Sequence, residues 1–143
     1  MSTRSLTKRA AGGMLLALLL FALHLTGCAM LSEQQVKLQD LGFTVVSEEK
    51  IPEELRTIVE EKKGNAFKLT YNDDAYLYIV IGYGQQPQGG YSIAVNELYL
   101  TEDAIFVDTT LLGPESTSAA GQTPSYPYIV LKTDYLDKPV VFE

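Results

Sequence analysis

The stretch "AYLYIVIGYG", residues 75–84, decides the fold class, because apolar side chains occupy both of its faces. Successive side chains of a strand point to opposite faces, so a strand that is apolar on both faces is buried on both. The stretch before it, "AFKLTY" (66–71), alternates apolar and polar residues, and "NDD" (72–74) between the two favours a turn. The sequence therefore predicts two strands joined by a turn, the second of them central in a sheet.

Further strand-like runs follow toward the C-terminus, and "GFTVVSEE" (42–49) could supply a first strand. The connections are too short for crossover helices, so we expect mainly antiparallel pairing. The predicted class is mainly β (α+β): a small antiparallel β-sandwich or partly open barrel of about six or seven strands with one N-terminal helix. The later runs are "YSIAVNELYL" (91–100), "AIFVDTTLL" (104–112), "YPYIVLKT" (126–133) and "PVVF" (139–142).

One segment, "IPEELRTIVEEKKG" (51–64), predicts the helix. Pro52 suits the first helical turn, and the acidic residues after it complement the helix dipole. Gly64 is the expected C-terminal cap. One stripe should face the core. Its members are Leu55, Ile58, Val59 and Lys62.

The N-terminus carries the pattern of a secretory signal peptide. Basic residues in "MSTRSLTKRA" (1–10) precede the apolar run "MLLALLLFAL" (14–23), which is too short to span a bilayer. The next segment, Leu25-Thr26-Gly27-Cys28, resembles the bacterial lipobox. The resemblance implies thioether lipidation of Cys28 and cleavage after Gly27, whereas an ordinary signal peptide with an incidental cysteine is the alternative.

This interpretation sets the expected organisation of the chain. Residues 1–27 are the lipoprotein signal peptide, residues 28–41 a lipidated polar tether, and residues 42–143 the β domain. We expect the protein in the cell envelope, anchored by lipid (palmitate among the acyl groups) on the outer face of a bacterial membrane. No cofactor is expected apart from the covalent lipid at Cys28.

Charge and composition narrow the function. The leader removes three bases and no acid from a chain with 18 acidic and 11 basic residues, which leaves 18 acids against eight bases. Without a basic cluster, nucleic-acid binding is not expected. The only histidine, His24, lies in the leader and the only cysteine is the expected lipid site, so Ser/His/Asp, Cys/His and His/Cys zinc chemistry are excluded from the mature chain. We expect a non-enzymatic protein with no catalytic residues and no metal.

Two pairs of adjacent acids, Asp73-Asp74 and Glu102-Asp103, are the remaining chemical candidates. Each pair lies between strand-like runs, where acids and amides favour turns. A calcium site or a carboxylate-based enzyme is the alternative, although neither pair shows the spacing of a calcium loop.

The segment "GGYSIAV" (89–95) of a glycine-rich loop, the small/polar loop near Gly113-Pro114 and the later segment "SYPYIVLK" (125–132) carry a resemblance that covers roughly Leu77 to Lys132. They resemble the C-terminal domain of the PrcB family, which is named for a lipoprotein subunit of a spirochaete protease complex. Gln88 and Pro124 depart from the family pattern. The matching positions are Gly89, Gly90, Tyr91, Ile93, Val95, Val107, Gly113, Pro114, Gln122, Tyr126, Pro127, Tyr128 and Val130.

The resemblance implies a subunit that binds, and could stabilise, an extracytoplasmic protein such as a protease. Tyrosines near loops suit such a binding surface. The predicted partner-binding residues are Pro87, Gly89, Gly90, Tyr91, Tyr126, Pro127 and Tyr128.

Three other functions stay open. Chagasin-like inhibitors of cysteine proteases use three loops at one end of a sandwich, and Pro87–Tyr91, Leu112–Pro114 and Tyr126–Tyr128 are similar in kind and order. A lipoprotein that binds envelope glycans or solutes would need a concave aromatic pocket. An enzyme acting on glycans would need two carboxylates roughly 5 to 9 Å apart in a cleft.

Overall fold

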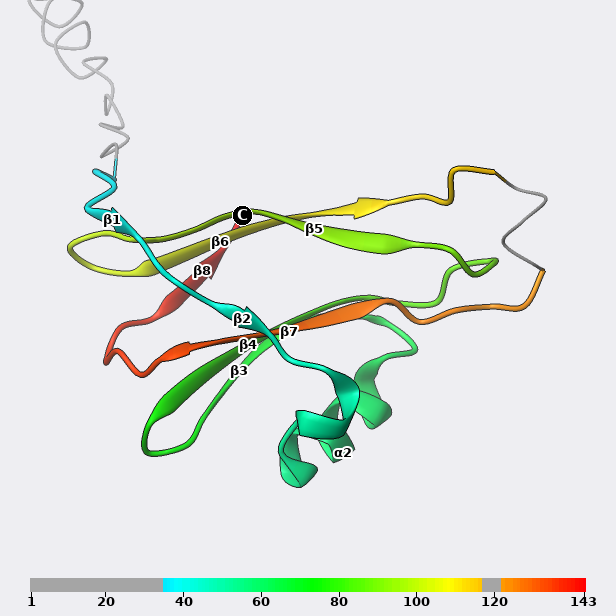
Figure 1. Cartoon of the computed structure of the whole chain (residues 1–143), viewed down its shortest axis with the longest axis horizontal. Coiled ribbons are helices and arrows are strands. Elements are labelled where there is room, and N and C mark those ends of the chain that lie inside the picture. The colour runs from blue at the N-terminus through cyan, green and yellow to red at the C-terminus, as the bar shows by residue number, and fades with distance from the viewer. Residues whose placement is uncertain (1–34, 117–121) are drawn as a thin grey trace, which may run out of the picture. The chain divides into compact units, whose positions relative to one another are not determined.

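The protein is described by a computed structural model that covers residues 35–116 and 122–143. The expected signal peptide and Cys28 lie outside these residues. Two four-stranded sheets pack face to face, and one helix covers the outer face of one of them (Figure 1). Within these residues the fold is the predicted sandwich with one N-terminal α-helix, with eight strands instead of the expected six or seven, and the sheets do not close into a barrel.

The sheet that carries the helix has the order β2-β7-β4-β3, and all its pairings are antiparallel. As predicted, β4 is central and buried on both faces. Leu77, Ile79 and Ile81 point into the sandwich, whereas Tyr78 and Val80 pack beneath the helix. The strands are β2 (Thr44–Val45), β3 (Ala66–Asn72), β4 (Tyr76–Tyr83) and β7 (Tyr128–Asp134).

The second sheet has the order β1-β5-β6-β8. Its pairing of β6 with β8 is parallel, an exception to the mainly antiparallel arrangement. A bulge at Asn96 shifts the register between β5 and β6, and the Asn96 amide binds Asp108 and Thr110 across the strands. The strands are β1 (Gln39–Asp40), β5 (Ser92–Leu100), β6 (Ile105–Leu112) and β8 (Val140–Phe142).

The helix α2 (Glu53–Lys62) follows a short 3-10 helix, η2 (Glu48–Lys50). Leu55 and Val59 are fully buried against β4 and β7, as predicted. Two details of the prediction are wrong. Lys62 is exposed because the buried stripe ends one turn earlier, and the C-cap is Lys63, whose N–H donates to the Val59 carbonyl without a left-handed glycine at position 64.

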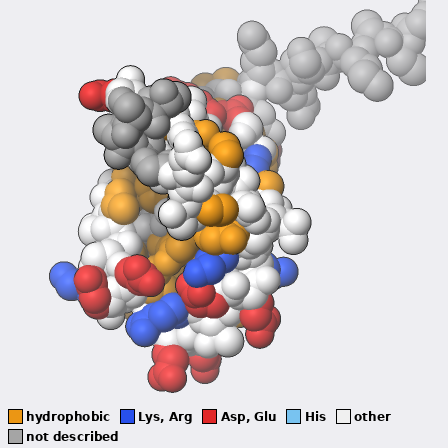
Figure 2. Space-filling model, turned by 90° about the vertical axis from the view of Figure 1, so that its right-hand side faces the viewer, with side chains coloured by type: hydrophobic (Ala, Val, Ile, Leu, Met, Phe, Trp, Pro, Cys, Tyr) orange, Lys and Arg blue, Asp and Glu red, His pale blue; other side chains and the backbone are white. Residues whose placement is uncertain are grey.

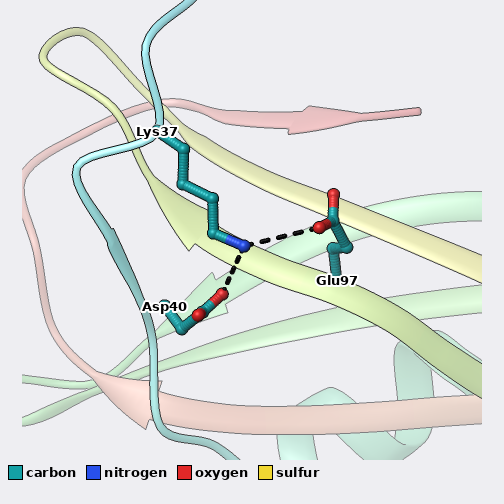
Figure 3. A network of polar contacts seen from close by, with 3 residues as sticks. All are labelled: Lys37, Asp40 and Glu97. Atoms are coloured by element: carbon teal, nitrogen blue, oxygen red, sulfur yellow. Dashed lines mark hydrogen bonds and ion pairs between the residues drawn. The ribbon is translucent and has the colours of Figure 1, made fainter.

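The last residues of the segment expected to be a tether pair with the second sheet. Gln39 and Asp40 pair with β5, and the Leu41 N–H donates to the Leu98 carbonyl over 2.9 Å. Lys37 forms ion pairs with Asp40 at 2.6 Å and Glu97 at 3.4 Å (Figure 3). The described part of the expected tether therefore packs on the second sheet.

The expected first strand over residues 42–49 is reduced to β2. After Val46 the chain leaves the sheet edge and enters η2. Residues 35–46 thus cross from one sheet to the other, and they contact both.

Candidate functional site

One end of the sandwich brings together the two segments that the sequence singled out. The connection from β4 to β5 (84–91) runs beside the segment that enters β7 (122–127). Gln86 and Ser125 exchange two backbone hydrogen bonds of 2.8 and 3.1 Å, and the Ser125 hydroxyl donates to the Gln88 carbonyl over 2.6 Å. We call this end, residues 84–91 and 122–128, the loop end.

The two connections are also tied to the sheet. The Tyr83 N–H donates to the Pro127 carbonyl over 3.0 Å, and the Gln85 N–H donates to the Gly64 carbonyl after the helix. Five of the predicted partner-binding residues therefore lie in neighbouring segments of one surface, with Pro127 beside them. They are Pro87, Gly89, Gly90, Tyr91 and Tyr126.

Two glycines of the loop end have backbone conformations that favour glycine. Gly84 has φ of 73° and Gly90 has φ of 84°. A Cβ atom at Gly84 would lie 2.8 Å from the Ala66 backbone nitrogen, so the turn out of β4 also requires close approach to β3. Gly89 has no positive φ, so only the second member of the Gly89-Gly90 pair needs this freedom.

The three tyrosines of the site differ in exposure. Tyr126 is 39% exposed, and the Lys63 ammonium lies 5.8 Å from its ring centroid. Tyr91 is half-buried beside Gly113. Tyr128 packs against the cluster under the helix, and burial raises the pKa of its hydroxyl. Tyr126 and Tyr91 are thus placed for contact, whereas Tyr128 also belongs to the core.

Figure 2 shows the loop end of the molecule. Hydrophobic side chains lie in the middle of this face, and acidic and basic side chains surround its lower part. Leu112–Pro114 and Tyr126–Tyr128 flank one connection, between β6 and β7. The three chagasin-like segments therefore belong to two connections, not to three separate loops.

Both pairs of adjacent acids lie in turns between strands, and among the described residues only the Asp73 carboxylate is seen to bond to its own turn. The Asp73 carboxylate accepts hydrogen bonds from the backbone N–H groups of Tyr76, at 2.7 Å, and Ala75, at 3.0 Å. At the β5–β6 turn, the buried Thr101 hydroxyl bonds to the Ala104 backbone, and the Lys138 ammonium donates to the Glu102 carbonyl. Within residues 35–116 and 122–143, no cluster of three or more metal-ligating side chains is present.

A groove of about 650 Å³ beside β2 is a feature that the sequence reasoning missed. Phe43, Tyr76, Tyr78 and Lys132 line it, and no local motif joins residues so far apart. The Lys132 ammonium lies 3.6 Å from the Tyr76 ring centroid, and Tyr78 is only 5% exposed. Lys132 therefore lies over the Tyr76 ring, whereas Phe43, which also lines the groove, is 41% exposed.

The described part of the chain contains no helix with the length and apolar character needed to cross a bilayer.

Together, these features define a small two-sheet β-sandwich with a composite loop end and a helix on one outer face. Residues 77–134 match the family model described as PrcB C-terminal, which confirms the predicted resemblance. We therefore assign this segment, from β4 through β7, to the PrcB C-terminal domain family. The family points to a subunit associated with a protease complex. Neither a curated protein nor a solved structure gives a significant match to the chain.

Proposed function

We propose that this protein is a non-enzymatic bacterial lipoprotein whose β domain binds, and stabilises, an extracytoplasmic protein partner such as a protease. The observation that carries the proposal is the pairing of Gln86 with Ser125, which holds the glycine loop and the Tyr-Pro-Tyr segment in one surface. The match of residues 77–134 to the PrcB C-terminal domain supports a role in a protease complex.

The proposal includes a lipid anchor at Cys28. The sequence supports it, because basic residues, a short apolar run and the Leu-Thr-Gly-Cys segment follow one another in the order of a lipoprotein signal. An acidic protein surface repels anionic lipid, so acyl chains would supply the membrane affinity, at about 0.8 kcal/mol per buried CH₂.

The anchor is tested with Cys28→Ser in cells fed a labelled fatty acid. The wild-type chain should take up the label and be shortened by its leader. The variant should do neither, because serine lacks the thiol that accepts the diacylglyceryl group. Label retained by the Cys28→Ser variant would contradict the anchor.

Partner binding is tested by affinity capture from a detergent-solubilised envelope with the lipidated chain. Tyr126→Ala should weaken capture of the partner by about 2 kcal/mol, in the range of an interface hot spot, while the melting temperature changes little. Tyr128→Ala should lower the melting temperature, because this ring packs under the helix. If the folded Tyr126→Ala and Tyr91→Ala variants both capture the partner as well as wild type, the loop end is not the binding surface.

An inhibitor role of the chagasin-like kind is a second candidate. The exposure of Tyr126 and the positive φ of Gly90 at one end of a sandwich favour it. Because the three chagasin-like segments belong to two connections, we place it second. If the chain inhibits a papain-like protease and Gly90→Val abolishes this inhibition, the inhibitor role is favoured over the stabilising role.

A further inference from the structure

A second groove lies at the edge of β7, directly beside the loop end. It has a volume of about 300 Å³, between the chain that leaves β2 and the start of β7. Its apolar lining comes from both sides, and Glu48 is the one carboxylate among the lining residues. These residues are Val45, Val46, Glu48, Ile51, Tyr126, Pro127, Tyr128, Ile129 and Val130.

The groove exists because β2 is short. Thr44 and Val45 pair with Lys132 and Leu131, and the Val46 N–H still donates to the Val130 carbonyl over 2.9 Å. The chain then turns away into η2. Among the described residues, none pairs with Tyr128 on this side of β7.

The backbone direction at Tyr128 follows from the alternation of a strand. The Pro127 carbonyl points toward β4, where it accepts from the Tyr83 N–H, and the Val130 carbonyl points toward β2. Main-chain groups alternate in direction along a strand, so the N–H and carbonyl of Tyr128 point into the groove. An extended chain there would continue β2 along the edge, which is strand addition to an open sheet edge.

The charges favour a basic occupant. Glu48 is exposed and has no ion pair among the described contacts. The other carboxylate that acts on Tyr128, that of Glu60, is paired with Lys63 at 2.5 Å. Arg56 and Lys63 also lie near Tyr128, but neither lines the groove, and Arg56 donates to the Ile51 carbonyl. A lysine or arginine of the occupant could therefore pair with Glu48.

We propose that the β7 edge binds an extended, apolar segment of the protein partner with a lysine or arginine opposite Glu48. This inference rests on the proposed function and names the kind of partner segment that the loop end receives. The segment would continue β2 beyond Val46, hydrogen-bond to the main chain of Tyr128, and cover the valines and Ile51 with apolar side chains.

The test is selection of ten-residue peptides from a random display library on the full-length lipidated chain in detergent micelles. Selected peptides should be rich in β-branched and basic residues. Hydrogen exchange at residues 126–131 should slow when they bind. N-methylation along a selected peptide should weaken binding at alternate residues only, because only every second N–H faces β7.

Glu48→Lys should weaken the binding of a selected peptide about five-fold or more, because the change removes an exposed ion pair and places two positive charges opposite each other. Asp74→Lys, the same charge change in an exposed turn at the opposite end, is the matched control and should leave binding unchanged. Acidic selected peptides, no alternation under N-methylation, equal effects of the two charge reversals, or no enriched peptide would each overturn the inference.

These outcomes separate the inference from the proposed function. If no peptide binds the groove while Tyr126→Ala still loses the partner, only the strand-addition inference fails. If peptides bind as described while the tyrosine variants still bind the partner, the loop end is not the partner-binding surface, but strand addition at the β7 edge remains supported.

Discussion

At the scale of single residues, the Asp73 carboxylate holds the β3–β4 turn together. Asp73 accepts from the backbone N–H groups of Tyr76 and Ala75, and these two hydrogen bonds, with the larger effect from Tyr76, lower the pKa of its carboxyl from the ordinary 3.8. Because the folded state favours the ionised form, the stabilising contribution is present above about pH 4 and is lost as pH falls through the folded pKa.

Asp73→Asn keeps an acceptor oxygen but removes the charge, so it should lower the melting temperature near neutral pH. The difference from wild type should stay constant from about pH 7 to pH 5 and shrink below about pH 4, because the wild-type carboxylate then becomes protonated. Thermal unfolding of both proteins across this pH range measures it. A difference that persists unchanged to pH 2 would show that the charge does not stabilise the turn.

At the scale of elements, α2 and its sheet form a second core outside the sandwich. Leu55 and Val59 contact Tyr78, Val80 and Val130, on the face of β4 opposite to the one buried between the sheets. This explains why "AYLYIVIGYG" is apolar throughout.

Leu55→Ala should lower the free energy of unfolding by about 2–5 kcal/mol, since the side chain is fully buried and leaves a cavity. Glu61→Ala, an exposed change on the same helix, should stay within about 0.5 kcal/mol of wild type. Urea unfolding of both variants checks this. Equal stabilities would mean that the helix does not depend on the sheet.

The sequence predicts elements well where one residue pattern determines them. The alternation of Phe67, Leu69 and Tyr71 gave β3, and the apolar stripe with Pro52 gave the helix. It does not reveal features that depend on distant residues. Gly82 lies under the Phe67 ring, where a Cβ atom would be 2.2 Å from a ring carbon, and no local pattern around Gly82 predicts this contact.

The same distinction applies to the site. The glycine loop and the Tyr-Pro-Tyr segment could be named from the sequence, because glycine, proline and tyrosine have special backbone or interface roles. Their pairing through Gln86 and Ser125 could not, since neither residue carries a motif. Nor could the groove at β7, which exists because the chain leaves the edge after Val46.

At the scale of the whole domain, the strands run between two different ends. Turns rich in acids, at Asp73-Asp74 and Glu102-Asp103, form one end, where Asp73 and Thr101 bind the backbone. The loop end, with Tyr126 and the β7 edge, forms the other. Partner binding is therefore expected at one end of the domain only.

Site-specific photo-crosslinking in intact cells tests this claim most directly. A benzophenone amino acid is introduced at Tyr126 in one variant and at Asp74, an exposed position at the opposite end, in another. If partner binding is confined to the loop end, a discrete crosslinked protein forms from position 126 and none from position 74. Equal crosslinking from both positions, or crosslinking from position 74 alone, would contradict it.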